Sequence, residues 1–285
     1  MDTVLAGSLP APPSTRRECS SVMVGGVKIG DGAPISIQTM TKTKTADVEG
    51  TLKQIRAAAE AGCEIARCAV DDDEAAWAFR KIVRQSPIPV VADIHFSHVL
   101  ALRALEAGAA KIRLNPGNIG ARDRIKEVLT LAKRLKTPIR IGINSGSLEK
   151  DILAKHGYPT AEALAESALR HMQICHDFGF HDLILSVKST DVRLTIEATR
   201  ILAQETKYPL HIGVTETGPP RTGLIKVSVG IGTLLSEGIG DTVRVTLLDD
   251  PVKEVETGRA ILRILGLRKE ETETGIPAEE PANRT

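Results

Sequence analysis

The stretch AAKIRLNPGNIGARDRIKEVLTLAKRL, from Ala109 to Leu135, contains one complete strand–helix unit. Its first six residues are a short apolar run, which predicts a strand with both faces buried. Residues 121–135 repeat apolar side chains at three- and four-residue spacing, which predicts a helix. Yet the strand contains Lys111 and Arg113 and ends in Asn115 and Asn118. Cationic and amide groups at the end of a buried strand require polar partners, so this unit raises the question of what they bind.

The same unit recurs along the chain. We expect strands over residues 35–40, 64–70, 89–94, 109–114, 139–144, 183–188, 210–216 and 241–247, and helices over 47–61, 73–84, 97–107, 121–135, 160–178, 191–204, 223–236 and 252–265. Parallel strands joined by helical crossovers can close on themselves at eight, so the pattern predicts an α/β protein of the (β/α)8 TIM-barrel class. A doubly wound open sheet is the alternative, but no G-x-G-x-x-G follows the first strand.

The barrel is expected to occupy residues 21–267. Residues 22–30, VMVGGVKIG, predict an N-terminal β-hairpin around Gly25-Gly26. Residues 1–20 are rich in Pro, Ser and Thr and predict a flexible arm. Residues 268–285 are polar and acidic and predict a disordered tail.

Composition excludes several classes of protein. Hydrophobic residues make up 42% of the 285 residues and aromatic residues only 2%, so the core must be aliphatic. With 37 basic and 36 acidic residues, the net charge of +1 argues against a nucleic-acid-binding or membrane-surface protein. No apolar run is long enough to span a bilayer, and the start does not resemble a secretory signal. Cys19, Cys63, Cys68 and Cys175 include no C-x-x-C pair, so we expect free thiols, no metal site and a cytoplasmic protein.

Five cations lie on five different predicted strands: Arg67, Arg113, Arg140, Lys188 and Arg244. We call these five residues the cation cluster. In a barrel the functional side chains gather at the carboxyl ends of the strands, where these cations would repel one another. Because burying an unpaired cation is costly, the cluster predicts a ligand with several negative charges, such as phosphates. The alternative is internal pairing, for which Asp93 and Glu216 could serve one or two of the cations.

Other candidates lie at the same strand ends. Glu216 could gain a proton near bound phosphate and act as an acid, or it could form an ion pair with one of the cations. His95 follows Asp93 at a strand end, which favours a functional role over the usual structural one for a single histidine. His171 and Cys175 share a helical face with metal-ligand spacing, but their place in an outer helix disfavours a metal.

Eight strings, taken together, carry a resemblance to a known family. They are VGGVKIG (24–30), PISIQTMT (34–41), VADIHF (91–96), KIRLNPGN (111–118), RIGINSGSL (140–148), LILSVKS (183–189), IGVTETG (212–218) and EGIGDTVRVTL (237–247). In this order, over roughly residues 20–267, the chain resembles the hydroxymethylbutenyl diphosphate synthases, which are iron–sulfur oxidoreductases of the methylerythritol phosphate route to isoprenoids.

The resemblance implies a TIM barrel followed by a smaller domain with a [4Fe–4S] cluster. It also implies reductive ring opening and dehydroxylation of 2-C-methyl-D-erythritol 2,4-cyclodiphosphate to 4-hydroxy-3-methylbut-2-enyl diphosphate, with electrons from ferredoxin or flavodoxin. Glu216 would match the carboxylate that assists C–O cleavage. The implied diphosphate-binding residues are Arg67, Arg113, Arg140, Asn144, Lys188, Arg244 and Thr246, the last usually Ser in the family. Asp93, His95, Asn115 and Asn118 match further pocket positions.

The cysteines depart from the family pattern. The resemblance implies three Cys and one Glu as cluster ligands in a domain beyond the barrel, whereas this sequence turns polar at Lys269 and its four cysteines match none of those positions. We therefore expect the barrel half alone, inactive unless a homodimer partner or a separate polypeptide supplies a cluster. The alternatives are a cluster-free phosphate-ligand-binding barrel or inactive relic and, on fold alone, a pterin or phosphosugar enzyme.

Overall fold

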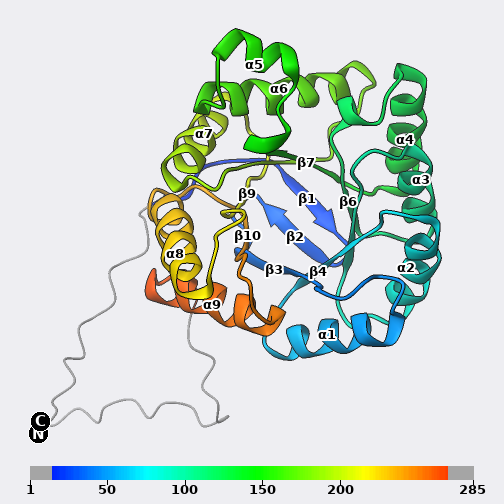
Figure 1. The fold of residues 1–285 in the computed structure, drawn as a ribbon, viewed down its shortest axis with the longest axis horizontal. Helices are drawn as coiled ribbons and strands as arrows, with labels where there is room; N and C mark the ends of the chain where they lie inside the picture. The colour runs from blue at the N-terminus through cyan, green and yellow to red at the C-terminus, as the bar shows by residue number, and fades with distance from the viewer. Residues whose placement is uncertain (1–14, 269–285) are drawn as a thin grey trace, which may run out of the picture.

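The computed structural model describes residues 15–268 and shows a closed barrel of parallel strands surrounded by helices (Figure 1). The strand order in the sheet is β8-β7-β6-β5-β4-β3-β10-β9, and a bridge between Leu185 and Leu210 joins the two edges. The strands are β3 (Ser36–Met40), β4 (Ile65–Ala69), β5 (Val90–Asp93), β6 (Lys111–Arg113), β7 (Ile139–Asn144), β8 (Leu183–Lys188), β9 (His211–Ile212) and β10 (Thr242–Arg244). The predicted TIM barrel is confirmed.

Helices cover the outside of the barrel (Figure 1). They are α1 (Val48–Glu60), α2 (Asp73–Gln85), α3 (His98–Glu106), α4 (Arg122–Leu135), α5 (Lys150–His156), α6 (Ala161–Asp177), α7 (Val192–Glu205), α8 (Pro220–Ser236) and α9 (Pro251–Ile264), with single 3-10 turns η1 (Pro116–Asn118) and η2 (Ser145–Ser147). Side chains of Asp47, Asp72, Ser97, Thr160, Asp191 and Asp250 cap the amino ends of six of them. The core between strands and helices is aliphatic.

Two local predictions differ from the structure. The segment after β7, in which no helix was expected, contains the short helix α5. The strands expected over residues 210–216 and 241–247 are reduced to β9 and β10, and the chain beyond each of them forms a loop. Both differences lie on the side of the barrel that carries the carboxyl ends of the strands.

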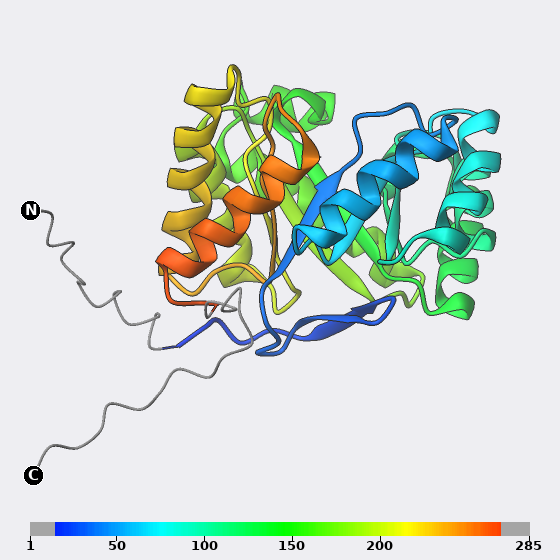
Figure 2. The same ribbon diagram turned by 90° about the horizontal axis from the view of Figure 1, so that it is seen from below.

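The hairpin of β1 (Ser21–Val24) and β2 (Val27–Gly30) lies across the amino end of the barrel (Figures 1 and 2). Its inward side chains Val22, Val24 and Ile29 pack against Ile65, Val91 and Ile184 at the starts of strands. Gly25 makes the turn with a φ of 57°, which favours glycine. Because the hairpin covers this end, the opposite end of the barrel is the one left for a ligand.

The residues that precede the hairpin contact the barrel where the structure describes them. Within the expected arm, Arg16 pairs with Asp241 at 3.0 Å, and Arg17 donates a hydrogen bond to the carbonyl oxygen of Thr206 at 2.7 Å. The rest of the predicted arm, residues 1–14, and nearly all of the predicted tail, residues 269–285, lie outside the described residues. Within residues 15–268, no helix is both long and apolar enough to cross a membrane.

Candidate anion site at the carboxyl end of the barrel

Strand register brings the charged residues of the sequence prediction side by side. Asp93 on β5 is paired with Arg113 on β6, and Arg113 with Arg140 on β7. All three are buried, with 1%, 6% and 4% of their surfaces exposed. Arg67 joins them from β4, because its Nη2 donates a hydrogen bond to Asp93 Oδ2 at 2.8 Å. Four of the predicted site residues therefore share one side of the barrel interior.

Asp93 is the carboxylate that balances two of these cations. Beyond its bond to Arg67, its Oδ1 lies 3.7 Å from Arg113 Nε. Burial alone would raise the pKa of Asp93, but Arg67 and then Arg113 hold this pKa far below its usual range. His95 is exposed, and its Nε2 lies 3.7 Å from Asp93 Oδ2 while its Nδ1 lies 3.3 Å from Asp71 Oδ1. Asp93 is therefore ionised, and its two oxygens face Arg67 and Arg113.

Asn115 and Gly142 fix the ends of β6 and β7. The side chain of Asn115 donates to the carbonyl oxygen of Gly142 at 3.1 Å and accepts from its N–H at 2.9 Å, and Arg113 Nη2 donates to the same oxygen at 2.6 Å. A Cβ at Gly142 would lie 2.7 Å from Arg140 Nη2 and 3.1 Å from Arg113 Nε. Because glycine has no Cβ, both guanidinium groups can lie against the backbone at position 142.

Arg140 and two further cations, Lys188 and Lys111, face the interior with no carboxylate within ion-pair distance among residues 15–268. Arg140 Nη1 is buried with no hydrogen-bond partner among those residues. Lys188 Nζ lies 3.2 Å from His211 Nε2, and Lys111 Nζ donates to Gln38 Oε1 at 3.3 Å. Burial, and after it the neighbouring guanidinium groups, hold the pKa values of Lys111, Lys188 and Arg140 well below their ordinary values.

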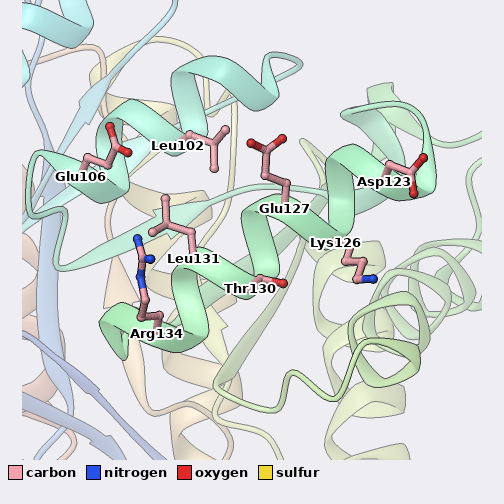
Figure 3. Close-up of a pocket in the computed structure, with 8 residues that line it drawn as sticks. All are labelled: Leu102, Glu106, Asp123, Lys126, Glu127, Thr130, Leu131 and Arg134. Atoms are coloured by element: carbon pink, nitrogen blue, oxygen red, sulfur yellow. The ribbon is translucent and has the colours of Figure 1, made fainter.

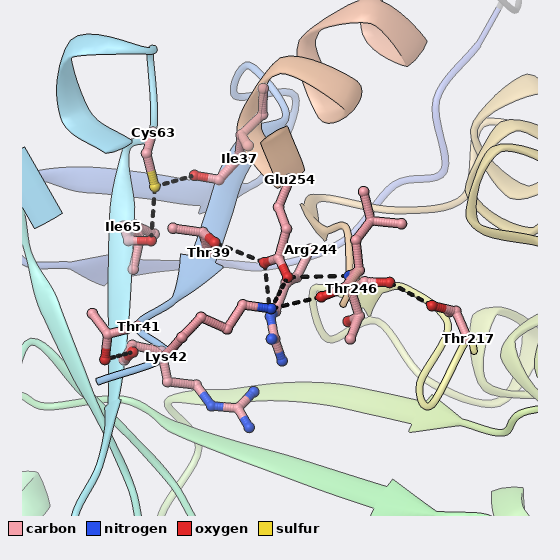
Figure 4. A network of polar contacts seen from close by, with 12 residues as sticks. Ile37, Thr39, Thr41, Lys42, Cys63, Ile65, Thr217, Arg244, Thr246 and Glu254 are labelled. Carbon is pink, nitrogen blue, oxygen red and sulfur yellow. Dashed lines mark hydrogen bonds and ion pairs between the residues drawn. The ribbon is translucent and has the colours of Figure 1, made fainter. Parts of the chain in front are cut away.

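Arg244 belongs to a second network, shown in Figure 4. Glu254 of α9 is buried; its Oε1 accepts from Lys42 Nζ at 2.7 Å, and its Oε2 accepts from Thr39 Oγ1 at 2.7 Å. Arg244 Nε lies 3.9 Å from Glu254 Oε2. Acids were expected to pair with these cations only at strand ends, whereas Glu254 lies on a helix. One cation of the cluster therefore has an internal counter-charge that was not expected.

Glu216 lies apart from the buried charges. It is exposed on the loop after β9, with a φ of 48°, and it makes no ion pair within residues 15–268. A positive φ is uncommon for a residue other than glycine and is found mostly where the surrounding loop imposes it. The alternative interpretation of Glu216, an ion pair with the cation cluster, is not what the structure shows.

Three remaining candidates are half-buried at the same end. Asn144 is paired in register with Lys188, Asn118 ends the turn η1, and the carbonyl oxygen of Thr246 accepts a hydrogen bond from Thr217 Oγ1 at 2.7 Å. Polar residues of this end that the sequence did not indicate are Gln38, His211, Lys42 and Glu254. Lys111 was noted within its strand but was not counted among the candidate site residues. The two-residue period of the strands could have identified Lys111 and Gln38, since inward positions alternate along each strand.

The described part of the chain does not fit an iron–sulfur cluster. No three His, Cys, Asp or Glu residues within it are grouped to hold a metal. Burial raises the pKa values of the Cys63 and Cys175 thiols to about 12 and that of Cys68 to about 11, so none of the three is a ready thiolate.

A groove of about 450 Å³ on the outer surface lies between α3 and α4 (Figure 3). Its lining includes Glu106, Glu127, Lys126 and Arg134, which carry both signs of charge. It is formed by helices of the outer layer and contains no predicted site residue. The groove is therefore separate from the charged barrel interior.

Comparisons of the sequence with known proteins agree on one family, and comparison of the structure shows the same fold in another. A family model described as the GcpE TIM-barrel domain matches residues 19–259. A protein of Clostridium perfringens is 53% identical over 90% of this chain and 73% of its own length, and one of Aquifex aeolicus is 54% identical over 89% and 71%. Both are named 4-hydroxy-3-methylbut-2-en-1-yl diphosphate synthase (flavodoxin). The dihydropteroate synthase of Yersinia pestis matches in fold, with a TM-score of 0.61 and 12% identity over 86% of this chain and 97% of its own.

Proposed function

Because the chain belongs to the GcpE family, we propose that its barrel is the substrate-binding half of a 4-hydroxy-3-methylbut-2-enyl diphosphate synthase. The proposed ligand is 2-C-methyl-D-erythritol 2,4-cyclodiphosphate, which the complete enzyme opens reductively with loss of a hydroxyl group. This ligand carries two linked phosphates on a small polyol, so it combines negative charge with groups that amides and hydroxyls can bind.

The observation that carries the proposal is the excess of buried positive charge. Arg67, Arg113, Arg140, Lys188, Arg244 and Lys111 face the barrel interior, where the buried carboxylates that contact them are Asp93 and Glu254. Arg140 Nη1, buried without a hydrogen-bond partner among residues 15–268, is the atom that most clearly requires an anionic one. Phosphate oxygens would satisfy it and would offset both the burial and the repulsion between cations, the two causes that lower the pKa values of Arg140 and Lys188.

Each candidate residue receives a proposed role. The cation cluster holds the diphosphate, Asn144 and Thr246 bind its oxygens or the hydroxyl groups, and Asp93 keeps Arg67 and Arg113 in place. Asn115 and Asn118 fix the loop beside the ligand, and His95 borders it. Glu216, exposed and in no ion pair within the part of the chain that the structure describes, is the proposed proton donor to the departing hydroxyl oxygen.

The redox part of the reaction lies outside this barrel. The four cysteines of the sequence do not form a cluster site in the described residues, so no electron-transfer step is assigned to them. We propose that residues 15–268 bind substrate but do not turn it over alone. The [4Fe–4S] cluster, with electrons from flavodoxin or ferredoxin, would be held by a domain outside residues 15–268. The absence of grouped ligands in these residues also supports a second candidate, a cluster-free barrel that binds cyclic diphosphate without reducing it.

Calorimetric titration of the purified chain with the cyclodiphosphate tests the binding proposal. We expect saturable binding at one site in the wild-type protein and severely weakened binding in Arg140→Ala. Absence of binding in the wild-type protein would remove the proposed function. Adding a separately produced cluster domain and reduced flavodoxin then distinguishes the two candidates, because only the synthase half would support product formation.

A further inference from the structure

The loop after β6 is held in place by a histidine from the outer helix layer. His171 of α6 is buried, and its Nδ1 accepts a hydrogen bond from the backbone N–H of Gly117 at 3.0 Å. Its Nε2 lies 2.9 Å from Glu149 Oε1. Because a backbone N–H can only donate, Nδ1 must be unprotonated, and the ring proton is assigned to Nε2, facing Glu149. Both ring nitrogens are thus engaged, which leaves neither for the metal considered from the sequence.

Glu149 is itself fixed from two sides. It is the residue immediately before α5, and its Oε2 accepts a hydrogen bond from Ser167 Oγ at 2.7 Å, one helical turn before His171 on α6. Partial burial would raise the pKa of Glu149, but the contacts with His171 and Ser167 lower it to about 2. The carboxylate is therefore charged and favours the imidazole tautomer that leaves Nδ1 free to accept from Gly117.

The imidazole and the loop fit each other closely. A Cβ at position 117 would lie 2.6 Å from His171 Cε1, a contact that real Cβ atoms do not make. The backbone of Gly117 can therefore approach the ring only because the residue is glycine. This close approach brings the N–H within hydrogen-bonding distance of Nδ1.

The other end of the loop is tied to the anion site. Asn115 exchanges two hydrogen bonds with Gly142, whose carbonyl oxygen also accepts from Arg113, and the N–H of Asn118 donates to the carbonyl oxygen of Asn115 at 2.9 Å. Glu149, in turn, belongs to the segment that follows Asn144. His171 and Glu149 together therefore connect the two loops that carry Asn118 and Asn144 at the mouth of the barrel.

We propose that His171 and Glu149 are a positioning pair that holds these two loops in their ligand-binding arrangement and so sets the affinity of the site for a diphosphate. The inference rests on the proposed function, since it takes the barrel interior as the diphosphate site. Neither residue touches the ligand, and both act through the backbone of Gly117 and the loop that contains it.

The test measures binding of inorganic pyrophosphate by calorimetry, well below the melting temperature of each variant. His171→Phe removes both ring contacts while keeping much of the volume, and we expect at least about tenfold weaker binding. His176→Phe is the matched control on the same helix, because His176 bonds to the Tyr208 hydroxyl at 2.8 Å rather than to a loop of the site. Its affinity should stay within about twofold of the wild type.

Two further variants keep the test decisive if His171→Phe does not fold. Glu149→Ala keeps the His171 ring but removes the carboxylate that favours the Nε2–H tautomer. It should weaken pyrophosphate binding less than His171→Phe does. His171→Asn should recover part of the affinity, because Asn Oδ1 can accept from the N–H of Gly117. Amide hydrogen exchange at Gly117 should be faster in Glu149→Ala and His171→Phe than in the wild type, and a long-range ¹⁵N–¹H spectrum should show the Nε2–H tautomer of His171.

The outcomes separate the two proposals. If the wild type binds pyrophosphate while the folded variants bind equally well and Gly117 exchanges at the same rate, the positioning pair is refuted and the proposed function stands. If the wild type does not bind pyrophosphate, the proposed diphosphate site fails and this inference fails with it. Weakened binding in the His171 and Glu149 variants, with His176→Phe unchanged, supports both.

Discussion

Arg67 and Asp93 form an ion pair inside the barrel, in which Arg67 Nη2 donates to Asp93 Oδ2 at 2.8 Å. The two residues come from the adjacent strands β4 and β5, and Asp93 has only 1% of its surface exposed. The pair leaves Asp93 Oδ1 turned toward Arg113 at 3.7 Å. One carboxylate therefore offsets the repulsion between two guanidinium groups that would otherwise be buried together.

Asp93→Asn should destabilise the empty protein at pH 7 by about 3–5 kcal/mol, the cost of removing one partner from a buried charge pair. Urea unfolding monitored by circular dichroism measures the change. Asp151→Asn is the control, since Asp151 pairs with Arg170 on the surface, with a 66% exposed side chain, and should change stability far less. An Asp93→Asn protein as stable as the wild type would show that Asp93 does not offset these cations.

The contribution of the Arg67–Asp93 pair to folding stability changes with pH in one direction. Because the pKa of Asp93 in the folded protein lies far below the ordinary value for an aspartate, its contribution to stability is fully present above about pH 4 and is lost only as the pH falls below that value. The stability difference between the wild type and Asp93→Asn should therefore stay constant from pH 7 to about pH 5. A difference that already shrinks between pH 7 and pH 5 would contradict the assigned ionisation.

Arg113→Ala should weaken cyclodiphosphate binding by about 2–3 kcal/mol, the upper range for a charge-assisted hydrogen bond. Arg113 is placed for this role by its bond to Gly142 and by its distance to Asp93. Isothermal titration calorimetry gives the affinity. Arg134→Ala, the same substitution on the exposed side of α4, should leave it unchanged. An affinity of Arg113→Ala equal to that of the wild type would take Arg113 out of the binding site.

Glu216→Gln should retain cyclodiphosphate binding while abolishing turnover in a system reconstituted with a cluster domain and reduced flavodoxin. The amide keeps the shape of the side chain but cannot release a proton to the leaving hydroxyl. Calorimetry and a product assay on the same preparation separate the two effects. Glu205→Gln, an exposed glutamate at the end of α7, is the matched control and should retain full turnover. Undiminished turnover in Glu216→Gln would refute the role of proton donor.

The fold could be predicted because each strand and each major helix has a sequence pattern that lies within a single short segment. Each strand is a short apolar run, and each major helix repeats apolar residues with its own period, so the barrel follows from the order of the units. Helix α5 was missed because its seven residues, KDILAKH, are too few to show that period. β9 was overestimated because apolar residues continue beyond Ile212, although the paired strand ends there.

The candidate site was predictable only in part, because its energetics depend on contacts between distant segments. The positions of Arg113 and Lys188 at strand ends can be inferred from periodicity alone. The hydrogen bond between Lys42 and Glu254 joins residues 212 positions apart, and only closure of the barrel brings α9 beside the end of β3. Similarly, nothing local to α6 indicates that His171 reaches Gly117, since that contact depends on how α6 packs against the loop after β6.

Gly142→Ala should disturb the anion site through a single methyl group. The new Cβ would lie 2.7 Å from Arg140 Nη2 and 3.1 Å from Arg113 Nε, so both guanidinium groups must move away from the ligand. We expect cyclodiphosphate affinity to fall by at least about tenfold, since small displacements of binding groups are costly. Gly146→Ala, four residues further on with no atom within 4 Å of its Cβ, is the matched control for titration calorimetry. Equal affinities of the two variants would mean that Arg140 and Arg113 do not bind the ligand together.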